Sequence, residues 1–175
     1  MSEPVARTPD QQRFLRIFAH LATVTAYARR RGSTDPDSIA AEAMTIAWRR
    51  LDAVPADPLP WLLGTARNLL LEQFRATERN RAPGGGEEAF TEPRLEPGGL
   101  SPDLEAALRR LAPIEREALL LIAWEGLTSA QAARSLGVAP VAFRVRLHRA
   151  RRRCAALLAA SDPPPIARPE VSNGR

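Results

Sequence analysis

The side chains best suited to chemistry in this sequence are arginines near its C-terminal end. Seven arginines and no acidic residue lie between Gly126 and Ser161. A guanidinium matches phosphate oxygens and guanine edges, whereas a merely solvated helix face usually carries both signs of charge. The pattern favours a polyanion such as nucleic acid as the partner. The alternative is a basic helical hairpin that binds no nucleic acid.

Other reactive side chains are scarce. The 175 residues include two histidines, one tyrosine and one cysteine, and all 25 lysine-or-arginine positions are arginine. Such a set offers no nucleophile–base pair and no cluster of metal ligands, so we expect no enzyme activity, no cofactor, no metal and no small-molecule substrate. Because Cys154 is the only cysteine, an internal disulfide is excluded.

Apolar runs of the length that membranes require are missing from the sequence. No segment approaches the ~18 apolar residues of a membrane span, and the first thirty residues lack the apolar core of a signal peptide. We therefore expect a cytoplasmic protein with no membrane partner.

The spacing of apolar residues predicts the helices that must position the arginines. In the first half it predicts helices over residues 13–31, 35–51 and 60–81, after a frayed lead-in at residues 1–10. No segment alternates polar and apolar residues for long enough to indicate a strand. The predicted fold class is therefore all-α.

Composition changes sharply over residues 82–100. These nineteen residues include five glycines, three prolines and four glutamates, which indicates a flexible acidic linker. Helices resume at Ser101 and continue to about residue 160, and residues 161–175 read as a disordered tail. We therefore expect two small helical domains, residues 11–81 and residues 101–160.

The second of these domains contains a helix-turn-helix pattern. Residues 128–136 form a short helix that opens with a capping box, Gly137 suits a left-handed turn, and a long helix starts at Pro140. If Phe143 and Leu147 face the core, the arginines of the long helix point outward, as in a recognition helix that enters a major groove.

The motifs in both halves resemble those of bacterial extracytoplasmic-function sigma factors. In the C-terminal half the similar segments are Glu115-Arg116-Glu117, Leu127-Thr128, Ala132-Ala133, Leu136-Gly137-Val138 and Arg146-Leu147-His148-Arg149-Ala150-Arg151. In the N-terminal half they are Asp35 to Arg50, Trp61-Leu62 and Ala66-Arg67-Asn68. The resemblance covers residues 13–160 in the family's order.

The resemblance implies an initiation factor that binds RNA polymerase core enzyme and promoter DNA, with an anti-sigma factor as a further candidate partner. The implied contacts to core enzyme are Asp35, Asp37, Glu42, Trp48 and Arg49. The implied contacts to the minus-ten element are Trp61, Arg67, Asn68, Arg75, Arg79 and Arg81. The implied contacts to the minus-thirty-five element are Thr128, Ala142, Arg144, Arg146, Arg149, Arg151, Arg152 and Arg153.

Two departures from the family pattern bear on function. In its second helix the family commonly has polar residues within the segment that reads Ser38, Ile39, Ala40 and Ala41 in this chain. Glu42, which follows this segment, is retained. Ala142 and Val145 stand where a threonine and a serine are common at the start of the recognition helix, which removes two hydroxyls able to bind phosphate or bases. Two other functions remain open, a stand-alone DNA-binding regulator and a protein-interaction adaptor that does not melt promoters.

Overall fold

The computed structural model describes residues 8–80 and 100–160, and these residues contain helices and no strand. The N-terminal helices are α1 Pro9–Phe18, α2 Leu21–Arg30, α3 Pro36–Arg49 and α4 Leu59–Asn80, with a short 3₁₀ turn at Leu51–Ala53. The C-terminal helices are α5 Pro102–Arg109, α6 Pro113–Ala123, α7 Ser129–Ser135 and α8 Pro140–Ala159. The all-helical fold class is confirmed for the described residues.

The prediction of a single helix over residues 13–31 is wrong in two respects. The first helix starts earlier than expected, because Thr8 and Gln11 form a reciprocal capping box and Pro9 occupies the first helical position. It is also split in two, since the amide of His20 donates to the carbonyl of Ile17 at 3.1 Å and tightens the backbone between α1 and α2. Residues 8–10 are therefore part of the first helix and its cap.

The other helices start within one residue of where the sequence indicates. The Asp35 side chain caps α3, Ser101 caps α5, and Pro36 and Pro102 follow them in the first helical turn. The predicted acidic linker and C-terminal tail lie outside the described residues, apart from Leu100.

One continuous apolar core joins the two halves of the chain. Its members include Tyr27 and Leu63 from the N-terminal half and Leu121 and Phe143 from the C-terminal half, each exposed by at most 1%. A second, smaller cluster around Leu108 and Cys154 lies among α5, α6 and α8. The packing of α4 against α7 is the main helix-to-helix contact across the two halves.

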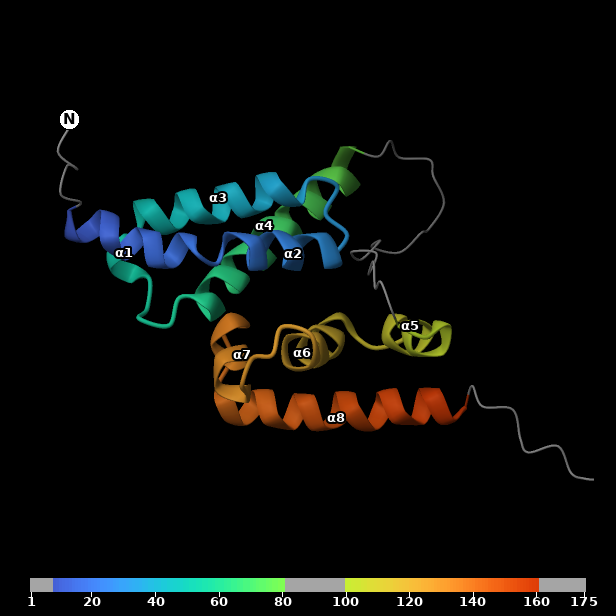
Figure 1. The fold of residues 1–175 in the computed structure, drawn as a ribbon. Helices are drawn as coiled ribbons and strands as arrows, with labels where there is room; N and C mark the ends of the chain where they lie inside the picture. Colours follow the sequence, from blue (N-terminus) through green and yellow to red (C-terminus); the bar gives the residue numbers. More distant parts are fainter. Residues whose placement is uncertain (1–7, 81–99, 161–175) are drawn as a thin grey trace, which may run out of the picture.

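The helices are arranged so that α3 and α8 lie on opposite sides of the molecule (Figure 1). Helices α1 and α2 run nearly in line beside α3, α4 crosses them, and α8 runs along the far edge of the C-terminal half (Figure 1). No helix among residues 8–80 and 100–160 is long and apolar enough to cross a membrane.

Candidate nucleic-acid interface

Helices α7 and α8 form the helix-turn-helix that the sequence predicts. Thr128 caps α7 through a reciprocal box with Gln131, and Gly137 takes the left-handed turn conformation with φ of 65°. Ala133, a small residue of α7, is fully buried. The turn therefore brings the start of α8 to the surface in a fixed direction, with Thr128 itself exposed.

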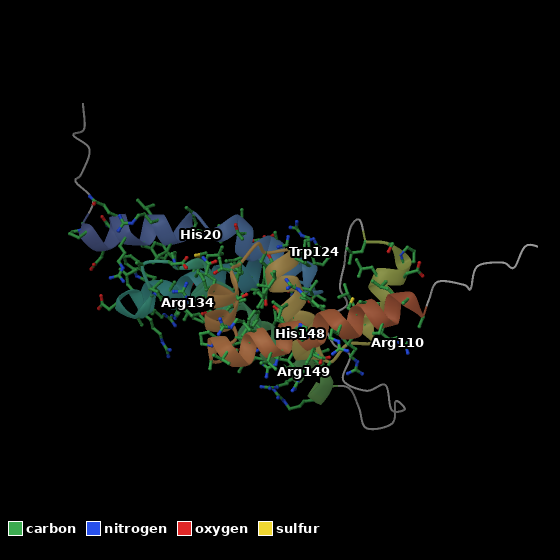
Figure 2. The ribbon with its side chains drawn as sticks, turned by 90° about the horizontal axis from the view of Figure 1, so that it is seen from below. His20, Arg110, Trp124, Arg134, His148 and Arg149 are labelled. Carbon is green, nitrogen blue, oxygen red and sulfur yellow. The ribbon has the colours of Figure 1, made fainter. Side chains whose placement is uncertain are left out.

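The outer face of α8 is basic. Phe143, Leu147, Ala150 and Cys154 are buried, which fixes the orientation of the helix. On α8, the exposed residues among those predicted to bind the minus-thirty-five element are Ala142, Arg144, Arg149, Arg151, Arg152 and Arg153. Figure 2 shows Arg149 and His148 on this helix, with Arg134 on the neighbouring α7.

Arg146 and Arg153 differ from the other arginines predicted to bind DNA through α8. Arg146 is half-buried, and one of its terminal nitrogens is buried with no hydrogen-bond partner among the described residues. The expectation that Arg146 points fully outward is therefore wrong, because its position lies on the flank of α8 next to the buried stripe. Arg153 is exposed but lies 3.6 Å from the Glu115 carboxylate.

A second polar surface lies between α3 and α4. A hollow there brings together Glu42 and Arg49 from α3 with Trp61 and Asn68 from α4. It continues into a second hollow lined by Asp35, Glu42, Arg75 and Arg79. Three of the residues predicted to contact core enzyme and four of those predicted to contact the minus-ten element therefore share one face of the N-terminal half.

Three predicted residues lie outside the two hollows, and a fourth lies outside the described residues. Trp48 packs edge-on against Phe14, with ring centres 5.0 Å apart, yet remains 48% exposed. Arg67 is half-buried, and its charge acts on Tyr27 and Glu117 between the two halves of the molecule. Arg81 lies outside the described residues, and Asp37 is exposed in the first turn of α3.

A buried charge cluster connects the two halves. Arg31 donates to Glu117 at 2.8 and 3.1 Å and to Glu125 at 3.2 Å. The Tyr27 hydroxyl donates to Glu117 at 2.9 Å, and Arg30 pairs with Glu125. We call these five residues the buried charge cluster. The Arg30 guanidinium also lies over the ring of Trp124, 6.0 Å from its centre, and Figure 2 shows where Trp124 lies.

The cluster shifts the acidity of its members. Burial opposes the charged form of Glu117, but the charge and hydrogen bonds of Arg31 and the Tyr27 hydrogen bond together hold the pKa of its carboxyl below its ordinary value. Burial, reinforced by the Glu117 charge, raises the pKa of the Tyr27 phenol well above its ordinary value. Glu117 is therefore charged and Tyr27 neutral at physiological pH.

A second set of contacts joins α7 to the N-terminal half. Asp57 accepts hydrogen bonds from Gln131 at 3.1 Å and from Arg134 at 2.7 Å. Between the same two halves, a Cβ atom on Gly64 of α4 would lie 2.7 Å from the carbonyl oxygen of Ser135. Only glycine allows α4 and α7 to approach this closely.

The Glu115-Arg116-Glu117 segment performs three structural tasks. Glu115 accepts from the amide of Ala112 at 3.3 Å, which closes the start of α6. Arg116 is buried and donates to the Leu108 carbonyl at 2.9 Å near the end of α5. Glu117 belongs to the buried charge cluster.

Sequence reasoning missed the contacts between the halves. In the sequence, Arg30 and Arg31 stand at the end of a predicted helix, and nothing local identifies a partner 86 to 95 residues away. Gly64 did offer a signal, since an isolated glycine inside a helical pattern often marks a close packing contact. Among residues 8–80 and 100–160, no three His, Cys, Asp or Glu side chains are grouped to hold a metal ion.

The chain is similar in sequence to known sigma factors. Residues 102–154 match the family described as "Sigma-70, region 4". The chain is 36% identical over 165 residues to the probable RNA polymerase sigma factor RfaY of Xanthomonas campestris pv. campestris, a match covering 85% of this chain and 41% of that protein. It is 31% identical over 150 residues to the ECF RNA polymerase sigma factor EcfG of Rhodopseudomonas palustris, covering 81% of this chain and 82% of that protein.

Solved structures share the fold. The sigma factor RpoE of Bartonella quintana, solved with the anti-sigma factor NepR, has a TM-score of 0.58 at 24% identity, covering 86% of this chain and 97% of that one. CnrH, solved with the cytosolic domain of CnrY, has a TM-score of 0.57 at 25% identity, covering 87% and 91%. The identity to EcfG over four fifths of both proteins places this chain in the family of ECF RNA polymerase sigma factors.

Proposed function

We propose that this protein binds RNA polymerase core enzyme and directs it to specific promoters, where transcription then starts. The observation that carries the proposal is the basic outer face of α8 within a helix-turn-helix, in a chain that belongs to the ECF family. The chain spans 41% of the length of RfaY, the longer of the two relatives named above, so this activity is proposed from the family and the surfaces together.

The two surfaces would divide the work between two promoter elements. The N-terminal half, residues 11–81, would bind core enzyme and the minus-ten element through the face between α3 and α4. The C-terminal half, residues 101–160, would read the minus-thirty-five element through α8. Trp61 supports the first assignment, since an aromatic ring beside a polar hollow can stack on an unpaired base.

Binding, not catalysis, would be the role of both surfaces. Arginines supply the contacts to phosphate and base edges, and those contacts need no cofactor. An anti-sigma factor is a further candidate partner, because RpoE was solved in complex with the anti-sigma factor NepR.

Run-off transcription with purified core enzyme tests the proposal. Core enzyme would be mixed with this protein and a library of promoter fragments, and the transcripts sequenced. We expect discrete starts on a subset of fragments that core enzyme alone does not use. A protein that binds the same fragments tightly without core enzyme, and gives no transcripts with it, would instead be a stand-alone regulator.

A further inference from the structure

The start of α8 carries two apolar side chains that are exposed. Val141 is 62% exposed and Val145 is 47% exposed. Within residues 100–160 they are the only large apolar residues exposed to this extent. Residues four apart on a helix are neighbours, so the two valines form one apolar patch.

The patch lies opposite the core. An α-helix turns about 100° per residue, and each valine is two residues from the buried Phe143. Val141 and Val145 therefore each point about 160° away from Phe143, and their directions differ from one another by only about 40°. Arg144 and Arg149 lie on either side of them. Packing does not require valine at these positions, and valine is a weaker helix former than most straight-chain residues.

A helix-turn-helix explains why apolar residues would be exposed here. The first residues of its second helix are those that reach base edges in the major groove. There thymine alone displays a C5 methyl group, and small apolar side chains make contact with that group. The flanking arginines and the lack of acidic residues favour DNA over an apolar protein surface as what covers the patch.

We propose that Val141 and Val145 read thymine methyl groups in the minus-thirty-five element, beside a base edge contacted by Arg144. This inference rests on the proposed function and adds the chemistry of the sequence that is read. It also explains why valine occupies position 145, where the family commonly has a hydroxyl side chain. A hydroxyl would bind phosphate or a polar base edge, whereas valine selects a methyl group.

The test replaces thymine by uracil, which removes only the methyl group. Holoenzyme made from this protein and core enzyme first selects promoters from fragments with a randomised upstream region. Each thymine of the selected element is then changed singly to uracil opposite adenine, and binding is measured. We expect the selected element to contain thymine, and roughly a fourfold loss of affinity at each contacted methyl.

Variants of the protein identify the side chain. Val145→Ser keeps a similar helix propensity and removes the apolar group, so its holoenzyme should no longer distinguish uracil from thymine at the affected position. Val141→Ser should do the same at a neighbouring base. Ala156→Ser, at an exposed position further along α8, is the matched control and should keep the full sensitivity to uracil.

Each other outcome overturns the inference in a recognisable way. If uracil is tolerated everywhere while Arg144→Ala still relaxes base preference, the valines do not read methyl groups but the proposed function stands. If the valine variants weaken binding of core enzyme and leave uracil sensitivity unchanged, the patch meets protein instead of DNA. If holoenzyme selects no sequence at all, the proposed function fails and the inference falls with it.

Discussion

At the scale of single residues, the arginines of α8 differ in what they can reach. Arg144 lies in the second turn of the helix, next to the exposed valines, whereas Arg151 lies two turns further on and also borders an apolar groove with Leu158. Residues at the start of a recognition helix meet base edges, and those further along meet the phosphate backbone.

This difference predicts distinct effects of two matched substitutions. Arg144→Ala should relax base preference at one promoter position by about 1–3 kcal/mol, because it removes a bidentate contact to a base edge. Arg151→Ala should weaken binding to every promoter by a similar factor and reduce its salt dependence. Holoenzyme binding to single-base promoter variants at two salt concentrations measures both. Equal losses on all promoters for both variants would contradict the division.

Glu117 leads to a prediction about pH. Its pKa is lower in the folded protein than in the unfolded chain, so the unfolded chain binds more protons in acid. The stability that Glu117 contributes is therefore present above the ordinary pKa of a glutamate and is lost as the pH falls through its folded value. Glu117→Gln should cost about 1–3 kcal/mol at neutral pH, because it removes the carboxylate of a buried pair.

Urea denaturation from neutral to acid pH checks this prediction. The stability of the Glu117→Gln variant should fall less steeply in acid than that of the unchanged protein. Glu105→Gln is a suitable control, since Glu105 forms an ordinary i,i+4 pair with the exposed Arg109. Parallel acid curves for the unchanged protein and Glu117→Gln would show that Glu117 does not have the lowered pKa.

At the scale of elements, α3 presents Glu42 and Arg49 on one face. The two residues are seven apart, about 20° from alignment on a helix, and both line the hollow toward α4. Both are exposed, so neither is needed for the core.

The element-scale prediction concerns this face. Glu42→Arg should abolish binding to core enzyme, because it reverses the charge at the centre of the proposed docking face. The circular dichroism spectrum should stay helical, since the side chain is exposed. Ala41→Arg places the same side chain at an exposed position of α3 outside the hollow and should bind normally. Co-purification with core enzyme measures both, and normal recovery of Glu42→Arg would place the docking face elsewhere.

The elements also show what sequence reasoning can reach. The capping box at Thr128, the turn at Gly137 and the buried stripe of α8 were predictable because each depends on residues a few positions apart. The break between α1 and α2 was not predictable, because the helical spacing of apolar residues continues through it without interruption.

At the scale of the whole molecule, the proposed function requires the two halves to move apart. The two promoter elements are about 25 base pairs apart, which is about 85 Å of DNA. A compact chain of this size has a radius of gyration of only about 14–16 Å. The packed halves cannot reach both elements at once, so the contacts at Gly64, Asp57 and the buried charge cluster must break when both are bound.

These long-range contacts were also the part of the structure that the sequence could not predict. Arg31 and Glu117 are 86 residues apart, and either charge alone reads as an ordinary surface residue. Sequence motifs identified the halves and their chemistry because those depend on local pattern. The packing between the halves depends on shape, which a single sequence does not display.

Gly64→Ala tests how closely the halves pack. Alanine favours the α4 helix by about 0.5–1 kcal/mol over glycine, so the N-terminal half should fold at least as well. The new methyl would meet the Ser135 carbonyl at 2.7 Å, so the halves should separate. We expect a larger radius of gyration in small-angle X-ray scattering.

The control for this prediction lies on the same helix. Thr65 lines the hollow between α3 and α4, so Thr65→Ala should leave the radius of gyration unchanged. An unchanged radius for Gly64→Ala as well would show that α7 shifts to absorb the methyl without opening the molecule.

Promoter opening by the assembled holoenzyme is the most direct test of the central claim. Permanganate, which oxidises unpaired thymines, would be applied to a selected promoter with this protein alone, with core enzyme alone and with both. We predict reactive thymines near the minus-ten element only when both are present, and their loss with Glu42→Arg. Thymines that react with this protein alone, or that never react with both, would contradict the claim that it is a promoter-specificity factor for RNA polymerase.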